Sequence, residues 1–318
     1  SFMFVIFIFK ISDTIFKPIN IINYDNSESL KSEYIDEKKT IIIILDEMSG
    51  INSSEKNYKY GKEFNDQIIN FAKKNDLRLY TDTFSISDNT GNSVSFLLNF
   101  QDSKPTKSMR YSFITETNKS YNDYSLKKNK FFDNYNNISV IQNIHLNFCN
   151  QLNVKKCYQF NPYKKNNNNL SGAKNNIFSK FFSLWRIDGS SFAKITWKIL
   201  MIVGVIDSVI EPVAHKIFLP LIFEKIKNDT ILGKFDLVFA HILAPHIPYG
   251  FNKDCSYDGK KSSFNTLMNY KEKIIQHNVE RICMIKILDN FFNDIKNLTN
   301  FEKLDIIILS DHGSRISS

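Results

Sequence analysis

Two long runs of apolar residues dominate the pattern of hydrophobic and polar positions along the chain. The first occupies residues 41–45 and the second residues 306–309. Uninterrupted apolar runs of this length are typical of strands that are buried on both faces in the middle of a parallel sheet. Each run ends in polar residues that can bind ligands: Asp46 and Glu47 after the first, and Asp311 and His312 after the second. Because ligands collect at the carboxyl ends of strands in open α/β sheets, we expect the two strand ends to lie side by side and to hold a metal.

The remaining pattern alternates between segments with helical spacing and short apolar segments. Further strands are predicted at 77–80, 138–141 and 235–241. Helices are predicted at 60–75, from Thr90 to residue 98, within the apolar region 190–227 as a core or interfacial pair, and at 263–298. The Asn-rich stretch 161–175 is a predicted flexible loop. This alternation favours an α/β domain with a mostly parallel sheet flanked by helices on both faces.

The N-terminal part of the chain differs from the rest, which suggests three regions. Residues 1–10 contain eight consecutive apolar residues that stop at Lys10, and a bilayer span needs about 20. We interpret this region as the tail of a transmembrane helix or membrane anchor, with an N-terminal strand or a signal-peptide remnant as alternatives. The polar region 11–37 is a predicted linker, and 38–318 is the predicted folded domain.

Composition and charge restrict the class of partner. The chain has 318 residues, of which 42% are hydrophobic, enough for one large α/β domain or two small ones. Its formal net charge is +8, but the lysines are spread through Asn-rich loops rather than gathered on one face. We therefore expect no nucleic-acid partner. A basic surface of this kind would suit docking on anionic lipid.

The four cysteines form two local pairs, Cys149 with Cys157 and Cys255 with Cys283. Neither pair has the CxxC spacing of a metal site. An even number of cysteines in paired positions suits disulfides, and hence an oxidising compartment. Four reduced core thiols are the alternative.

The ends of the predicted elements supply groups that can do chemistry. They are Asp46 and Glu47, Thr90 near a helix N-terminus, His241 and His246 after the strand 235–241, and Asp311 with His312. Carboxylate, imidazole and hydroxyl ligands together suit Zn or Mn. Such a metal would lower the pKa of a coordinated Thr hydroxyl and make it a nucleophile at neutral pH. Each group also has a structural explanation, such as an N-cap for Thr90, but a parallel sheet would bring all of them to one edge.

Three motifs contain most of these residues. They are Ile-Ile-Leu-Asp46-Glu47, His241-Ile-Leu-Ala-Pro-His246-Ile-Pro-Tyr249 and Ser310-Asp311-His312-Gly313-Ser314-Arg315. In this order and spacing they resemble the alkaline phosphatase/sulfatase superfamily, over most of residues 38–315. The resemblance implies an alkaline-phosphatase-like fold in which Asp46, Asp311 and His312 are metal ligands, with Glu47 as a second choice. It also implies that Thr90 is the nucleophile and that His246, together with His241, binds the substrate anion.

The nucleophile separates the subclasses of this superfamily. Sulfatases carry a Cys or Ser in a Cys/Ser-x-Pro-x-Arg motif, whereas this chain has Thr90-Gly-Asn-Ser-Val. A plain Thr is similar to the lipoteichoic-acid synthases and phosphoethanolamine transferases of bacterial envelopes, which are membrane-anchored with the catalytic domain outside the cytoplasm. Their Cys-Gly-Thr loop is missing before Thr90. A further His that the superfamily places after Asp-His-Gly is also missing, so we expect the domain 38–318 to be truncated at its C-terminus.

The resemblance therefore implies a membrane-anchored, extracytoplasmic, metal-dependent phosphotransferase or phosphohydrolase. Its substrate would be a phosphate ester such as a phospholipid head group, and an envelope glycan or water would be the acceptor. One alternative is a sulfatase-type hydrolase of sulfate or phosphate esters. Another is a non-catalytic envelope protein that keeps the fold.

Overall fold

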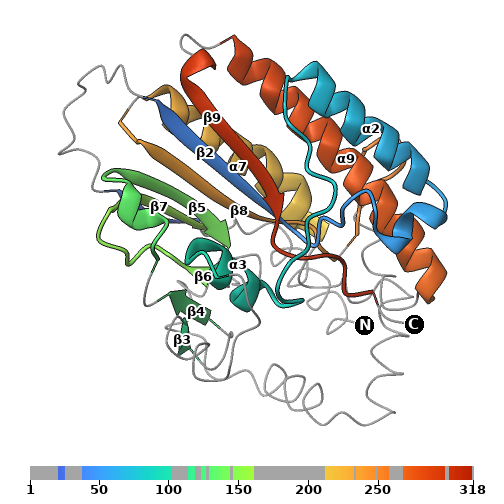
Figure 1. Cartoon of the computed structure of the whole chain (residues 1–318), viewed down its shortest axis with the longest axis horizontal. Helices are drawn as coiled ribbons and strands as arrows, with labels where there is room; N and C mark the ends of the chain where they lie inside the picture. Colours follow the sequence, from blue (N-terminus) through green and yellow to red (C-terminus); the bar gives the residue numbers. More distant parts are fainter. Residues whose placement is uncertain are drawn as a thin grey trace, which may run out of the picture. The chain divides into compact units, whose positions relative to one another are not determined.

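The computed structural model describes the greater part of the predicted folded domain (Figure 1). The described residues are 21–25, 38–101, 114–118, 123–126, 129–143, 146–160, 212–232, 234–247, 249–257, 268–297 and 301–316. Apart from Ile21, they belong to one compact unit, made of Ile22–Phe160 and Pro212–Ser318. The predictions for the N-terminal anchor, for the loop 161–175 and for the first part of the region 190–227 lie outside the described residues.

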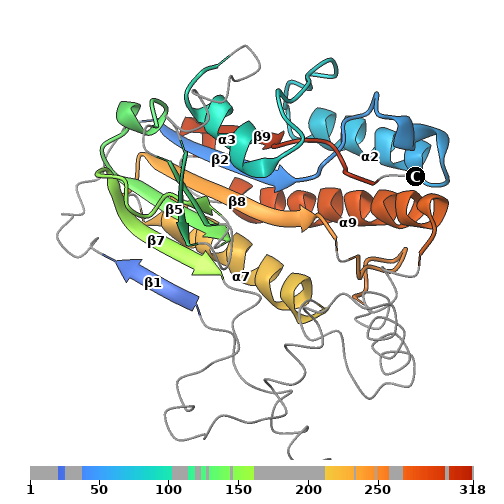
Figure 2. The same ribbon diagram turned by 90° about the horizontal axis from the view of Figure 1, so that it is seen from below.

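A six-stranded sheet forms the centre of this unit (Figures 1 and 2). In spatial order its strands are β1 (Ile21–Asp25), β7 (Val154–Phe160), β5 (Ile138–Asn143), β8 (Leu237–Pro245), β2 (Lys39–Asp46) and β9 (Leu304–Ser310). The pairs β7–β5, β5–β8, β8–β2 and β2–β9 are all parallel. The prediction of a mostly parallel α/β sheet is therefore confirmed, and β1 adds a strand within the predicted linker 11–37.

A second, smaller sheet contains β3 (Ile114–Asn118), β4 (Asp123–Leu126) and β6 (Leu146–Asn147). β3 and β4 pair antiparallel, and β4 and β6 pair parallel. No element had been predicted in this region, because its polar residues show no clear period.

Helices cover both faces of the six-stranded sheet, as predicted (Figure 2). α3 (Thr90–Leu98) lies on one face, while α7 (Pro212–Ile231) and α9 (Tyr270–Lys296) contact β8 from the other. α2 (Gly61–Lys74) packs on α9, where the rings of Phe71 and Phe292 meet edge to face with centroids 5.2 Å apart. The remaining elements are the short 3-10 helices η2 (Ser54–Asn57), η3 (Phe132–Asn134) and η5 (Phe301–Lys303).

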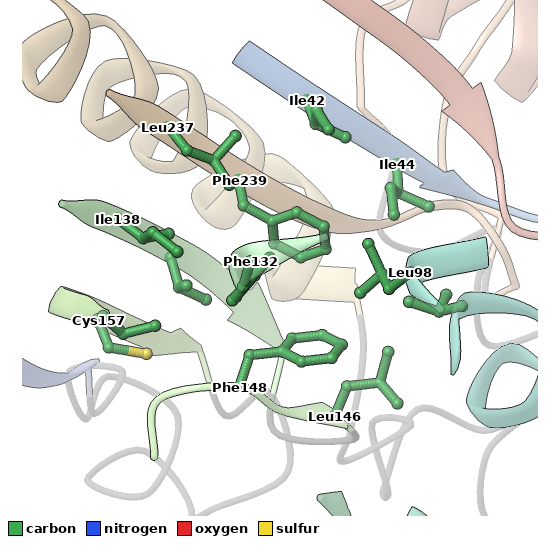
Figure 3. Close-up of a cluster of buried hydrophobic side chains, with 13 residues drawn as sticks. Ile42, Ile44, Leu98, Phe132, Ile138, Leu146, Phe148, Cys157, Leu237 and Phe239 are labelled. Atoms are coloured by element: carbon green, nitrogen blue, oxygen red, sulfur yellow. The ribbon is translucent and has the colours of Figure 1, made fainter. Parts of the chain in front are cut away.

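The apolar run of β2 packs on both faces, because successive side chains of a strand point to opposite sides. Ile42 and Ile44 join a core cluster with Leu98 of α3 and Phe239 of β8, shown in Figure 3. Residues 41, 43 and 45, which alternate with these, are also buried. The prediction that this strand is buried on both faces is thus confirmed. Because β2 lies between β8 and β9, its last residues end beside theirs.

One predicted strand is absent, and another is present but less buried than predicted. Residues 77–80 form a loop instead of a strand. The N–H of Leu77 donates to the carbonyl oxygen of Ala72 at 2.8 Å, at the end of α2. Tyr80 is exposed. β9 is not a central buried strand. It is the last strand of the sheet within the described residues, and the side chain of Ile307 is 43% exposed. An apolar run indicates a strand but does not reveal on how many sides the strand has neighbours.

β7 had not been predicted, because two lysines interrupt its apolar residues. One of them, Lys156, is buried because its Nζ lies 3.0 Å from Asp229 Oδ1 on α7. The hydroxyl of Ser139 on β5 donates to the other carboxylate oxygen. This ion pair attaches α7 to the sheet through residues that no apolar pattern identifies.

Both predicted cysteine pairs are disulfides, Cys149–Cys157 and Cys255–Cys283. The second connects the segment after β8 to α9, which follows it in the chain. In the described part of the chain, no helix combines the length and apolar character that a membrane span requires.

Candidate active site at the carboxyl ends of three strands

The carboxyl ends of β8, β2 and β9 meet at one edge of the sheet. The strand register pairs Leu45 with Ser310 and Asp46 with Pro245, so the residues that follow each strand are neighbours. This confirms the prediction that the two apolar strands end side by side. Thr90 reaches the same edge at the start of α3.

Asp46, Asp311 and His312 form a buried group whose ligand atoms all lie within 4.8 Å of one another. His312 Nε2 is 3.6 Å from Asp46 Oδ1 and 3.6 Å from Asp311 Oδ2. The backbone orients Asp311, because its Oδ1 accepts the N–H of Glu47 at 3.1 Å and the N–H of His312 at 2.7 Å. Its second oxygen, Oδ2, accepts neither of these hydrogen bonds and faces the other members of the buried group.

The Thr90 hydroxyl is held against this group at the N-terminus of α3. Asn89 is the N-cap of the helix, and its side chain accepts the N–H of Asn92 at 3.3 Å. Thr90 Oγ1 lies 3.1 Å from His312 Nε2, and His312 Nδ1 lies 2.7 Å from the carbonyl oxygen of Gly313. A carbonyl can only accept, so we assign the ring proton to Nδ1, which leaves Nε2 as the acceptor for the Thr90 hydroxyl. The same tautomer offers Nε2 to a metal, with Nδ1–H held by the backbone.

The pKa values of the two carboxyl groups are shifted in opposite directions. Burial, together with the negative charge of Asp311, raises the pKa of Asp46 well above its ordinary value. Burial would also raise the pKa of Asp311, but the neighbouring His241 and His312 hold it at about 2. His241 is fully buried on β8, with Nε2 3.7 Å from Asp311 Oδ2. The protein thus stabilises the negative charge of Asp311 and destabilises that of Asp46.

The unsatisfied atoms of the group test whether a metal fits. Asp46 Oδ1, Asp311 Oδ2 and both ring nitrogens of His241 are buried without a hydrogen-bond partner among the described residues. Such groups are normally paired, and two carboxylates in one buried site repel each other. A divalent cation would use these lone pairs and offset the charge, and carboxylate and imidazole donors suit Zn or Mn. The residues present therefore fit a divalent metal, with Asp46, Asp311 and His312 as the residues that would hold it.

Glu47 and His246 lie in a neighbouring cluster with Arg315. Glu47 has a positive φ of 63°, and its Oε1 lies 2.7 Å from Arg315 Nε and 3.6 Å from His246 Nε2. Arg315 Nη2 lies 2.9 Å from His246 Nε2, while His246 Nδ1 bonds the carbonyl oxygen of Ile247. The structure thus places the Glu47 carboxylate against Arg315, outside the group formed by Asp46, Asp311 and His312. No role had been expected for Arg315 itself, although it belongs to the third motif.

A second buried network, absent from the sequence predictions, supports the loops that carry these residues. Glu55 Oε1 accepts a hydrogen bond from Ser49 Oγ at 2.9 Å and another from the hydroxyl of Ser314. Arg281 of α9 donates from Nη1 to the carbonyl oxygen of Ser49 at 3.0 Å. The loop after β2 and the loop after β9 are therefore attached to each other and to α9.

The polar residues of α9 are the sequence signal that could have revealed this network. His277, Glu280 and Arg281 follow helical spacing within a stretch, 277–285, that is entirely buried. Burial and the charge of Arg281 lower the pKa of His277 to about 3. The neutral ring donates from Nε2 to the carbonyl oxygen of Glu47 at 3.0 Å. Charged residues inside an otherwise apolar helical stretch indicate buried polar partners.

Comparison with known proteins adds one match. No family model matches the chain, and none of the curated proteins matches it. Among solved structures, the chain is similar to the integral membrane protein lipooligosaccharide phosphoethanolamine transferase A (EptA) from Neisseria meningitidis. The sequences are 11% identical, the TM-score is 0.41, and the match covers 98% of this chain and 48% of that chain. The chain thus spans about half the length of that protein.

Proposed function

We propose that this chain carries the catalytic domain of a membrane-anchored, extracytoplasmic, metal-dependent phosphotransferase or phosphohydrolase. The observation that carries the proposal is the position of the Thr90 hydroxyl, 3.1 Å from His312 Nε2, which itself lies 3.6 Å from each of two buried carboxylates. The hydroxyl also opens α3, where free N–H groups and the helix dipole favour an anion. A nucleophile in these surroundings suits attack on a phosphate ester.

Two displacements at phosphorus would complete the reaction. In the first, a bond forms from Thr90 Oγ to phosphorus, the bond from phosphorus to the leaving alcohol breaks, and the Thr90 proton passes to that alcohol. In the second, a bond forms from the hydroxyl oxygen of an envelope glycan or of water to the phosphorus of phospho-Thr90, the bond from phosphorus to Oγ breaks, and the proton of the attacking hydroxyl passes to Oγ, which restores Thr90. A divalent metal held by Asp46, Asp311 and His312 would lower the pKa of a hydroxyl and offset charge on the transferring group.

The location of the enzyme belongs to the same proposal. Residues 1–10 would be the membrane anchor, 11–37 the linker and 38–318 the catalytic domain. Two disulfides support an oxidising compartment, and a net charge of +8 suits an anionic lipid surface. The substrate would then be a phosphate ester such as a phospholipid head group, and no nucleic-acid partner is proposed.

Replacement of Thr90 in the full-length protein tests the proposal. Turnover of phosphatidylethanolamine and of p-nitrophenyl phosphate would be measured with added Zn or Mn. We expect Thr90→Ala to abolish turnover and Thr90→Ser to keep part of it, because Ser retains a hydroxyl. Lys38→Ala is the matched control. Lys38 lies before β2, pairs with Asp305 at 3.7 Å, and is about 25 Å from the site because β2 rises about 3.3 Å per residue.

The outcomes separate this proposal from the alternatives. Turnover retained by Thr90→Ala at the wild-type rate would contradict it. Turnover of p-nitrophenyl sulfate would favour a sulfatase-type hydrolase. A protein that binds neither Zn nor Mn would favour a non-catalytic role.

A further inference from the structure

Arg315 connects the three loops that leave the carboxyl ends of β9, β2 and β8. It lies in the loop after β9, and its Nε donates to Glu47 Oε1 in the loop after β2 at 2.7 Å. Its Nη2 donates to Nε2 of His246, which follows β8, at 2.9 Å. One guanidinium group thus joins the three segments whose strands present the candidate active site.

The backbone before Arg315 is fixed by the second buried network. The N–H of Ser314 donates to Ser49 Oγ at 2.9 Å, and the Ser314 hydroxyl donates to Glu55. Ser49 is held in turn by Arg281 through its carbonyl oxygen at 3.0 Å. Because both its backbone and its Nε are held, Arg315 loses little additional conformational freedom when it binds a ligand.

Arg315 is the solvent-facing member of its cluster. Its side chain is 42% exposed, whereas that of Glu47 is 4% exposed. A guanidinium has five N–H donors, and the two contacts described above use one N–H of Nε and one of Nη2. Nη1 makes no hydrogen bond within the described part of the chain, so donors remain for a ligand that arrives from solvent.

His246 cannot supply an N–H donor from Nε2 in this arrangement. Its Nε2 accepts from Arg315 and its Nδ1 bonds the carbonyl oxygen of Ile247, so both ring nitrogens are in use. The N–H groups that this cluster can present to an anion are therefore those of Arg315. The resemblance had implied that His246 binds the anion directly.

We propose that Arg315, held by Glu47 and His246, binds the non-bridging oxygens of the phosphate group of the substrate. The proposal rests on the proposed function and extends it, because it selects substrates that carry an anionic phosphate. A guanidinium matches two phosphate oxygens with parallel N–H donors, and a lysine ammonium cannot keep that geometry while it also holds Glu47. His246 then acts as a positioning residue for the guanidinium.

The test measures phosphate recognition separately from chemistry. In the full-length protein, the Kd of inorganic phosphate is measured by calorimetry for wild type, Arg315→Ala, Arg315→Lys and the distant control Lys38→Ala. Loss of a charge-assisted contact predicts a Kd about 10- to 100-fold higher in Arg315→Ala. Arg315→Lys should lie between wild type and Arg315→Ala, and Lys38→Ala should match wild type. KM should rise by a similar factor for both p-nitrophenyl phosphate and phosphatidylethanolamine in micelles, with a smaller change in kcat.

Each outcome bears on one proposal. A Kd for phosphate that is unchanged in Arg315→Ala overturns the role of Arg315, as does a KM increase confined to the lipid substrate. If Arg315→Ala shows no cooperative melting transition, Arg315→Lys decides, and an unchanged Kd there overturns the role equally. Turnover retained by Thr90→Ala overturns the proposed function instead, while phosphate binding still tests Arg315.

Discussion

Replacing Asp46 by Asn should leave the metal-free protein as stable as before, or more stable, and should remove its response to metal. Asp46 is 2% exposed, and its ligand oxygen lies within 4.8 Å of those of Asp311 and His312. Its Oδ1 has no hydrogen-bond partner among the described residues. Burial and the charge of Asp311 raise its pKa, which means that its negative charge opposes folding. An amide of the same shape removes that charge.

The magnitude follows from the spacing of the two carboxylates. The ligand atoms of the two carboxylates lie within 4.8 Å of each other. Unit charges at that upper limit repel by about 3.5 kcal/mol at an effective dielectric constant of about 20. The positive charge of Arg315 offsets part of this repulsion, so we expect a gain between zero and about 2 kcal/mol. With metal, the wild type should gain about 2.7 kcal/mol at 100 times Kd. For a domain of this size the gain corresponds to an increase of about 5 to 10 °C in Tm. Asp46→Asn should lose this metal-induced increase.

Thermal unfolding measures both effects, with and without EDTA and with Zn or Mn added after EDTA is removed. Asp229→Asn provides a matched control, since it removes a second buried aspartate from the same unit. Asp229 pairs with Lys156 at 3.0 Å, and the Lys156 side chain is 11% exposed. Breaking such a buried pair costs about 3 to 5 kcal/mol. Asp229→Asn should therefore melt lower by about 10 °C while keeping its metal response.

Opposite results would refute the reasoning. If Asp46→Asn lowers the metal-free Tm by as much as Asp229→Asn does, Asp46 is a structural carboxylate with favourable partners. If the metal gain survives in Asp46→Asn, the metal binds elsewhere.

Two further predictions concern stability. In the chain-entropy account, opening the Cys255–Cys283 bridge, with a sequence separation of 28, should cost about 3.5 kcal/mol, and opening Cys149–Cys157, with a separation of 8, about 2.5 kcal/mol. Urea unfolding of the two double Cys→Ser variants measures this, and the reverse order would contradict it. Burial would raise the pKa of Glu55, but side-chain hydrogen bonds lower it from 4.5 to about 2. Its contribution to stability is therefore present above pH 4.5 and lost as the pH falls toward 2, so unfolding of Glu55→Gln should depend less on pH in that window than unfolding of the wild type.

The local pattern of the sequence was enough to identify the strands and residues that build the candidate site. The run 41–45 predicted a central strand, because a strand buried on both faces leaves no polar position. The sequence identified Asp46, Asp311 and Thr90 because each lies at the end of a predicted element. A parallel sheet brings such ends to one edge, so their joint occurrence indicated a site. The disulfides followed from an even number of cysteines in local pairs.

The tertiary structure decided what lies around those residues. The apolar run of β9 did not show that this strand is the last of the sheet within the described residues, because neighbours across a sheet come from distant parts of the chain. The sequence pattern assigned no role to Lys156 in β7 or to Arg281 in α9, since a charge is stable in a core only beside partners that the fold supplies. Arg315 was visible in its motif, yet its contacts to Glu47 and His246 join segments about 270 and 70 residues away, respectively. Local propensity specifies the elements and their ends, whereas long-range pairing specifies which buried charge meets which partner.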